Sequence, residues 1–180
     1  MKDYFQRIAL ELFKNIQKDE FLIINFDAEE SNFVRLNKAR IRQPGNVRQI
    51  SMSLSLSNRD KRNLKSFVRL NGDFNRDLAT LIKTLNYLRR ELPDLPKDPY
   101  LLFSKSVQST EICDIEKTIN DEENLDYIFS KVSGLDLVGI YSSGYIYTGL
   151  ANSLGQFNWH SDYSFSFDYS IYNENNNAIK

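Results

Sequence analysis

The sequence contains a single cysteine, Cys113, and a single histidine, His160. One cysteine excludes an intramolecular disulfide framework and is typical of a reducing compartment. Zinc usually takes three or four ligands from His, Cys and carboxylate side chains, and here only one His and one Cys are available, far apart in the chain. A Ser-His-Asp triad would have to use His160, and no Gly-x-Ser-x-Gly segment is present to expose a serine nucleophile. The sequence therefore predicts no catalytic residue, no metal ligand and no cofactor in this chain.

Long apolar runs and a strong net charge are also absent. No segment approaches the ~18 apolar residues of a membrane-spanning helix, and the amino terminus has the pattern of an amphipathic helix rather than a signal peptide. We therefore expect a cytoplasmic protein with no membrane partner. The formal net charge is −1, which argues against nucleic-acid binding driven by overall charge.

The charge is nevertheless divided along the chain. Residues 35–69 carry ten basic side chains against one acid, Asp60, whereas residues 111–126 carry seven acids against Lys117. This division indicates either pairing within the protein or an oriented surface for another subunit.

The pattern of residues 32–71 predicts three consecutive antiparallel strands, a meander with turns at residues 44–46 and 58–60. In the second strand the serines alternate with apolar residues, which places the apolar side chains on one face. These apolar residues are Met52, Leu54 and Leu56. The opposite face is predicted to be solvent-exposed and basic; its residues are Arg35, Lys38, Arg40, Arg42, Arg48, Arg59, Lys61, Arg62, Lys65 and Arg69. It is either solvated strand surface that prevents edge pairing or a charged surface for peptide carboxylates or nucleic acid.

Three helices are predicted around this meander from apolar residues at helical spacing. They cover residues 1–18, residues 73–92 with Asp73 or Asn75 as the N-cap, and residues 120–134 with Asn120 as the N-cap. A short apolar strand is expected at residues 21–26. Pro93 ends the second helix, and a Pro-rich connector near 93–99 is predicted to be extended and non-helical.

The final third is predicted to be β-structure. Strands at residues 137–141 and 145–151 flank Ser-Ser-Gly at residues 142–144, which we interpret as a hairpin turn. Asn152 begins a further turn, and two more strands follow it. The predicted fold class is α+β, an antiparallel β-sheet (meander plus C-terminal hairpins) with about three helices packed on it. We expect a single domain over residues 1–180, truncated at its C-terminus.

Two stretches resemble the TldD/PmbA family, which comprises proposed metallopeptidases also named modulators of DNA gyrase. The first is Phe-Val-Arg-Leu-Asn-Lys-Ala-Arg-Ile-Arg-Gln-Pro-Gly-Asn-Val at residues 33–47. The second is Asn-Ser-Leu-Gly-Gln at residues 152–156, followed by Ser-Phe-Asp-Tyr-Ser-Ile-Tyr at 166–172 and Ala-Ile-Lys at 178–180. Their order and separation resemble the N-terminal domain of the family, over essentially the whole chain.

The resemblance implies a non-catalytic N-terminal domain of a metalloprotease subunit, which contributes to the peptide-substrate cleft and to subunit assembly. The metal-bearing members of the family carry a helix with two histidines and a glutamate downstream of this domain, and the sequence contains no such helix. The chain looks closer to the PmbA-like branch, whose subunits can lack the metal and work beside a metal-bearing partner. Zinc is thus expected only in a metal-bearing family region or partner subunit, and this chain alone is predicted to be inactive. A homo- or hetero-oligomer with a TldD-like subunit is expected.

The candidate substrate- or partner-binding residues are Arg35, Arg40, Arg42, Asn152 and Trp159. The three arginines are placed to bind peptide carboxylates if an extended peptide adds to the free edge of the meander. Aromatic residues of the final third are expected to be exposed and to support a dimer or weak oligomer. These aromatic residues are Tyr145, Tyr147, Trp159, Tyr163 and Tyr172.

Two other functions stay open. The chain could act as a stand-alone protein- or peptide-interaction module with no protease function, using the same edge or basic face. Nucleic-acid binding is suggested by the basic meander and by the family's gyrase-linked name. The neutral total charge and the lack of a recognisable binding motif count against it.

Overall fold

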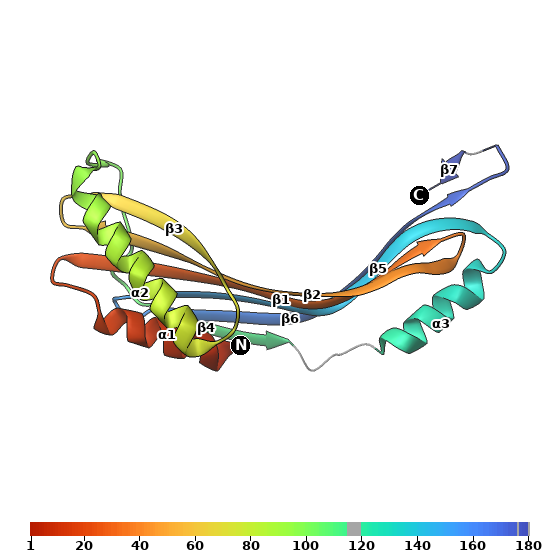
Figure 1. The fold of residues 1–180 in the computed structure, drawn as a ribbon, viewed down its shortest axis with the longest axis horizontal. Helices are drawn as coiled ribbons and strands as arrows, with labels where there is room; N and C mark the ends of the chain where they lie inside the picture. The colour runs from red at the N-terminus through yellow and green to blue at the C-terminus, as the bar shows by residue number, and fades with distance from the viewer. Residues whose placement is uncertain (115–119, 176, 180) are drawn as a thin grey trace. The chain divides into compact units, whose positions relative to one another are not determined.

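The computed structural model describes residues 1–114, 120–175 and 177–179 of the chain. Figure 1 shows its elements, which are α1 (Lys2–Lys14), β1 (Glu20–Asn37), β2 (Arg40–Asn58), β3 (Asn63–Leu70), α2 (Phe74–Glu91), η1 (Leu92–Asp94), β4 (Thr110–Asp114), α3 (Asp121–Val132), β5 (Asp136–Asn152), β6 (Phe157–Tyr172) and β7 (Ala178–Ile179). The fold is α+β, with an antiparallel sheet and, among the described residues, three α-helices. The predicted fold class is confirmed.

The strands of the described residues form one open sheet in the order β3-β2-β1-β5-β6-β4, and β7 pairs with β6. β2 and β3 pair antiparallel, from Ile50 opposite Leu70 to Ser57 opposite Asn63. Residues 40–49 of β2 therefore have no β3 partner. Within the part of the chain that the structure describes, they form a stretch of sheet edge.

Internal contacts divide the chain into two compact units, and each is described by itself. The first unit consists of Met1–Ala28, Gln49–Cys113 and Tyr147–His160. The second unit consists of Glu29–Arg48, Asp114–Ile146 and Ser161–Lys180. Strands β1, β2, β5 and β6 contribute residues to both units. The single domain expected over residues 1–180 stays a prediction.

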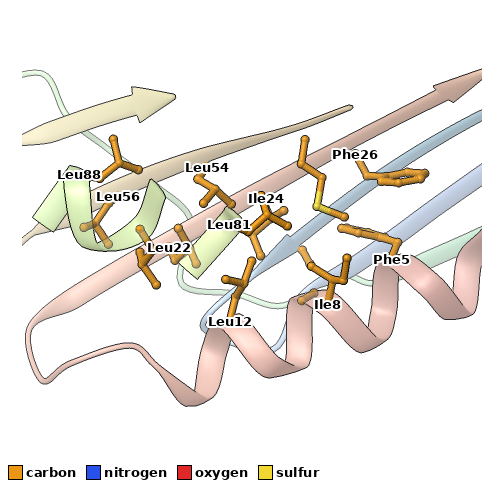
Figure 2. Packing of buried hydrophobic residues seen from close by; sticks show 14 of the residues in the cluster. Phe5, Ile8, Leu12, Leu22, Ile24, Phe26, Leu54, Leu56, Leu81 and Leu88 are labelled. Carbon is orange, nitrogen blue, oxygen red and sulfur yellow. The ribbon is translucent and has the colours of Figure 1, made fainter. Parts of the chain in front are cut away.

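The core of the first unit lies between two helices and the sheet. Figure 2 shows Phe5, Ile8 and Leu12 of α1 directed toward the apolar side chains of β1. The predicted alternation in β2 is confirmed, because Met52, Leu54 and Leu56 are all fully buried in this core. The apolar part of the buried face of α2 is formed by Leu81, Leu85 and Leu88. Burial of this apolar surface is the main stabilising contribution to the unit.

The ends of α2 agree with the sequence. The Asp73 carboxylate caps the helix by accepting a hydrogen bond from the backbone N–H of Arg76 at 2.8 Å, and the helix ends at Glu91. The Pro-rich connector near 93–99 is not entirely extended, however. Pro93 lies in the single 3₁₀ turn of η1, where a proline near the start of a helix removes no helical hydrogen bond.

Near this end of α2 a bidentate ion pair joins the helix to β1. The Arg89 guanidinium donates to both carboxylate oxygens of Glu20, at 2.6 and 2.8 Å. Burial alone would raise the pKa of Glu20, but the Arg89 hydrogen bonds, the hydrogen bond from the backbone N–H of Gln17 and the Arg89 charge together outweigh it and leave that pKa lowered.

The second unit has a smaller core under α3. The Asn120 side chain caps α3 by accepting from the backbone N–H groups of Glu122 and Glu123, as predicted. Gly134, with φ of +81°, follows the end of the helix. Val132 packs against Leu36 of β1 and Leu137 of β5.

Two predicted turns are wrong, and each turn sequence lies within a strand. The first bend lies at Lys38 and Ala39, both with φ of 51°, the backbone that two-residue hairpin turns require. Pro44 instead lies inside β2, in the stretch without a β3 partner, where a strand tolerates proline. Residues 142–144 lie inside β5. Gly144 is there because a Cβ would overlap the carbonyl oxygen of Glu30 on β1.

The serine face of β2 is also less exposed than predicted. Ser53 and Ser57 are buried, and the Asn63 side chain donates hydrogen bonds to Ser55 and Ser57, both at 2.8 Å. The basic residues of the meander divide between the two units at residues 48 and 49.

Candidate functional site

Two of the candidate arginines line one groove of the second unit, here named the basic groove. Its volume is about 470 Å³. It crosses four neighbouring strands, in the order β2, β1, β5 and β6. The side chains that set its chemistry are Arg35, Arg42, Val138, Ile140, Asp168 and Ser170.

Strand alternation explains why these side chains are accessible. On β5 the buried Leu137 and Tyr141 alternate with Val138 and Ile140, which are 42% and 37% exposed. Successive side chains of a strand point to opposite faces. Val138 and Ile140 are therefore directed away from the core that Leu137 forms with α3.

Among the described residues, no carboxylate pairs with either arginine of the groove. The Arg35 guanidinium lies 5.7 Å from the ring centroid of Phe33, and neither Arg35 nor Arg42 forms an ion pair with another described residue. Arg48, further along β2, pairs with Glu30 at 2.9 Å. The Phe33 ring in turn covers Gly45, where a Cβ would overlap it. The sequence motif at 33–47 is thus a pair of strands that holds two accessible guanidinium groups on one surface.

Arg40 does not line the basic groove. It lines a separate depression of about 970 Å³, with Phe129 of α3 and residues 133–136. Arg42 lines both hollows. The structure therefore places Arg35 with Arg42 in the basic groove, and Arg40 with Arg42 in the separate depression.

Asn152 has a local structural role. Its side-chain oxygen accepts hydrogen bonds from the backbone N–H groups of Leu154 and Gln156, at 2.9 and 3.1 Å. Gly155 completes the turn with φ of +97°. This geometry explains the Asn-Ser-x-Gly pattern of the second motif, since the asparagine shapes the turn between β5 and β6.

Trp159 is a core residue. Only 3% of its surface is exposed, and its ring lies 6.1 Å from Phe5 and 6.1 Å from Tyr147 between ring centroids. The expectation that Trp159 is exposed is wrong, because the apolar interior beneath α1 encloses it. Of the other aromatic residues expected to be exposed, Tyr172 is exposed, whereas Tyr145, Tyr147 and Tyr163 are half-buried. The other exposed large apolar residues from residue 137 onward are Val138, Ile140, Ile146, Leu154, Phe165, Tyr169 and Ile179.

A polar network at the start of α3 was not predicted. The Asp121 carboxylate accepts hydrogen bonds from the hydroxyl groups of Tyr141 at 2.9 Å, Ser143 at 2.6 Å and Tyr163 at 3.3 Å. Partial burial and the Asp121 charge raise the pKa of both tyrosines. The sequence pointed to Asp121 only as a helix N-terminal acid. Its link to β5 and β6 joins residues far apart in the chain.

The single histidine and cysteine do not come together. His160 on β6 and Cys113 on β4 are both exposed. In residues 1–114, 120–175 and 177–179, no three His, Cys, Asp or Glu side chains lie close enough to hold a metal ion. These residues do not fit the zinc that the family resemblance assigns to another region or subunit. None of the described helices is both long and apolar enough to cross a lipid bilayer.

Three solved structures share this arrangement of elements. A proposed modulator of a DNA gyrase from Thermotoga maritima matches with a TM-score of 0.61 and 11% identity, over 98% of this chain and 41% of that chain. TldE from Thermococcus kodakarensis matches with a TM-score of 0.57 and 10% identity, over 94% of this chain and 43% of that one. A proposed modulator of DNA gyrase from Bacteroides thetaiotaomicron matches with a TM-score of 0.60 and 19% identity, over 98% of this chain and 42% of that one. This chain has their fold.

The resemblance to the TldD/PmbA family is thus confirmed at the level of fold, over nearly the whole chain. No model of a protein family matches the sequence, and no curated protein matches it either. The chain spans about two fifths of the length of the similar solved structures, between 41% and 43%. At 10% to 19% identity the similarity establishes a fold and not an activity.

Proposed function

We propose that this chain is a non-catalytic, peptide-binding domain of a TldD/PmbA-type subunit, which contributes to a substrate cleft and to subunit contacts. The fold shared with TldE and with two proposed gyrase modulators supports the family. The observation that carries the peptide-binding role is the stretch 40–49 of β2, which has no β3 partner.

An extended peptide can add to such an edge as one more strand. Backbone N–H and C=O groups then provide the affinity, and side chains of the edge strand provide the selectivity. Eight of the ten side chains at residues 40–49 are exposed, so the edge is not covered by other described residues. Arg40 and Arg42 lie along it, where peptide carboxylates would be bound.

Hydrogen exchange tests this proposal. A saturating extended peptide, for example eight residues of alternating Thr and Val, is expected to slow exchange of the backbone amides at residues 41–49 by about tenfold or more, because added-strand hydrogen bonds protect them. Residues 51–57 pair with β3 already and serve as the internal control. Unchanged exchange at 41–49 with saturating peptide would contradict the edge-binding role.

Subunit contact is expected to use exposed apolar residues of the second unit. Phe165 is 55% exposed and Ile146 is 46% exposed, and exposed apolar side chains of this size favour association. We expect sedimentation to show a concentration-dependent dimer or weak oligomer that Phe165→Ser weakens. Leu10→Ser on α1 is the matched control, since Leu10 is 54% exposed in the first unit. A monomer at every concentration would refute this contact.

A further inference from the structure

We propose that the basic groove binds acidic peptides, taking one carboxylate on Arg35 and Arg42 and an apolar side chain on Val138 and Ile140. The inference rests on the proposed peptide-binding function and names the class of peptide. It concerns the face of the sheet, whereas strand addition concerns the edge of β2.

The first argument is the charge of the groove. Arg35 and Arg42 line the same hollow, and neither has an ion-pair partner among the described residues. Two like charges on neighbouring strands repel each other. A carboxylate between two guanidinium groups removes that repulsion and accepts charge-assisted hydrogen bonds from both.

The second argument is the apolar surface beside the arginines. β5 lies next to β1 in the sheet, so Val138 and Ile140 lie about one strand spacing, ~4.8 Å, from the strand that carries Arg35. Both side chains are well exposed. An extended peptide advances about 3.3 Å per residue. A side chain two or three positions beyond the acid would therefore reach Val138 and Ile140.

The order of the strands gives the groove a direction. Arg42 and Arg35 lie on β2 and β1 at one end, and Asp168 and Ser170 of β6 line the other end. The favoured ligand has one acid, followed by an apolar residue.

Nucleic acid fits this groove less well. A polyphosphate backbone places a negative charge on every nucleotide, and it would meet the apolar surface of β5. The net charge of −1 also gives no long-range attraction for a polyanion.

Calorimetric titration tests the inference with acetylated, amidated peptides containing Glu-Ser-Leu, Gln-Ser-Leu or Glu-Ser-Ser. The first is expected to bind about tenfold or more tightly than the second, because only a carboxylate forms charge-assisted hydrogen bonds with the two arginines. The third measures the apolar contribution and is expected to bind more weakly than the first. A peptide with a free C-terminal carboxylate and no acidic side chain tests whether the groove binds the C-terminus of a peptide. Single-stranded DNA tests whether the groove binds nucleic acid.

Arg35→Gln and Arg42→Gln are each expected to weaken binding of the Glu-Ser-Leu peptide by about tenfold or more. Arg69→Gln, an exposed arginine of β3 in the first unit, removes the same charge and should change affinity by less than about twofold. Both groove arginines are exposed, so thermal melting should show that the variants fold normally. Peptide-induced shifts of the Val138 and Ile140 methyl resonances should locate the ligand.

Equal affinity for the Glu and Gln peptides, or unchanged affinity in Arg35→Gln and Arg42→Gln, would overturn the acidic-peptide site. Tighter binding of DNA that depends on the same arginines would overturn it too. If the uncharged Thr-Val peptide still protects residues 41–49 in these variants, the proposed function stands and only the groove assignment fails. If the Thr-Val peptide does not protect residues 41–49 in the unmodified protein, but peptides bind in a carboxylate-dependent way, the groove assignment stands and the edge-binding role fails.

Discussion

Leu85→Asp is expected to unfold the first unit. Leu85 has no exposed surface and lies in the core between α2 and the sheet. Truncating a buried leucine costs about 2–5 kcal/mol, and burial of a carboxylate without a partner adds several kcal/mol. A domain of this size has a total stability of about 5–15 kcal/mol. We therefore expect circular dichroism to show a loss of helix and of the cooperative melting transition.

The matched control is Ala79→Asp, which places the same charge at an exposed position of α2. Its free energy of unfolding should change by less than about 1 kcal/mol, mostly through the lower helix propensity of Asp. Ser55→Asp is not a suitable control, because Ser55 accepts a hydrogen bond from Asn63 in a half-buried position. If Leu85→Asp melts within a degree or two of the parent, the assigned core of α2 is wrong.

Local patterns correctly predicted the three helices and the buried face of residues 52–56 in β2. The N-caps Asp73 and Asn120 were identified from residue type and position, since capping depends on hydrogen bonds within a few residues. The burial of Met52 and its alternating neighbours followed from the two-residue period of a strand. These features depend on short stretches of chain, which a sequence displays directly.

The turns at residues 44–46 and 142–144 were predicted incorrectly because the backbone conformation of these residues depends on neighbouring strands. Pro-Gly-Asn is a strong local turn signal, but Pro44 lies in an unpartnered stretch of β2 that accommodates it. Gly144 permits the close approach of β1. The real bend, at Lys38 and Ala39, carries neither glycine nor asparagine.

The candidate site was predictable only in part. Arg35 and Arg42 were selected from the motif at 33–47, and the structure brings them into one groove. No local pattern indicated that Val138 or Asp168 would be their neighbours, because strand order decides which residues share a face. Trp159 was selected as an exposed aromatic, but its ring packs beneath α1.

A buried carboxylate, Asp77, was also missed. It is 3% exposed and occupies the same stripe of α2 as Leu81 and Leu85. The four-residue spacing from Asp77 to Leu81 was the available signal. An acid in the first turn of a helix is usually explained by its favourable interaction with the helix dipole. That explanation applies to an exposed acid, so the burial of Asp77 was not predicted.

Asp77→Ala is expected to lower the free energy of unfolding of the first unit by about 2–5 kcal/mol. The Asp77 carboxylate accepts hydrogen bonds from the Tyr4 hydroxyl at 2.6 Å and from the backbone N–H groups of Gly72 at 2.8 Å and Asn71 at 3.2 Å. It therefore joins α1 to the loop that leads into α2. Burial and this hydrogen bond raise the pKa of Tyr4. Removal of the carboxylate leaves three donors without their acceptor, and urea denaturation measures the loss.

Two variants separate the carboxylate from its individual contacts. Tyr4→Phe removes one hydrogen bond and keeps the loop anchored, so it should cost about 1 kcal/mol. Asp77→Asn keeps the shape but turns an N–H₂ group toward one of the donors, so its cost should lie between those of Tyr4→Phe and Asp77→Ala. If Asp77→Ala costs no more than Tyr4→Phe, the two backbone hydrogen bonds contribute nothing, and the carboxylate does not hold the loop between β3 and α2.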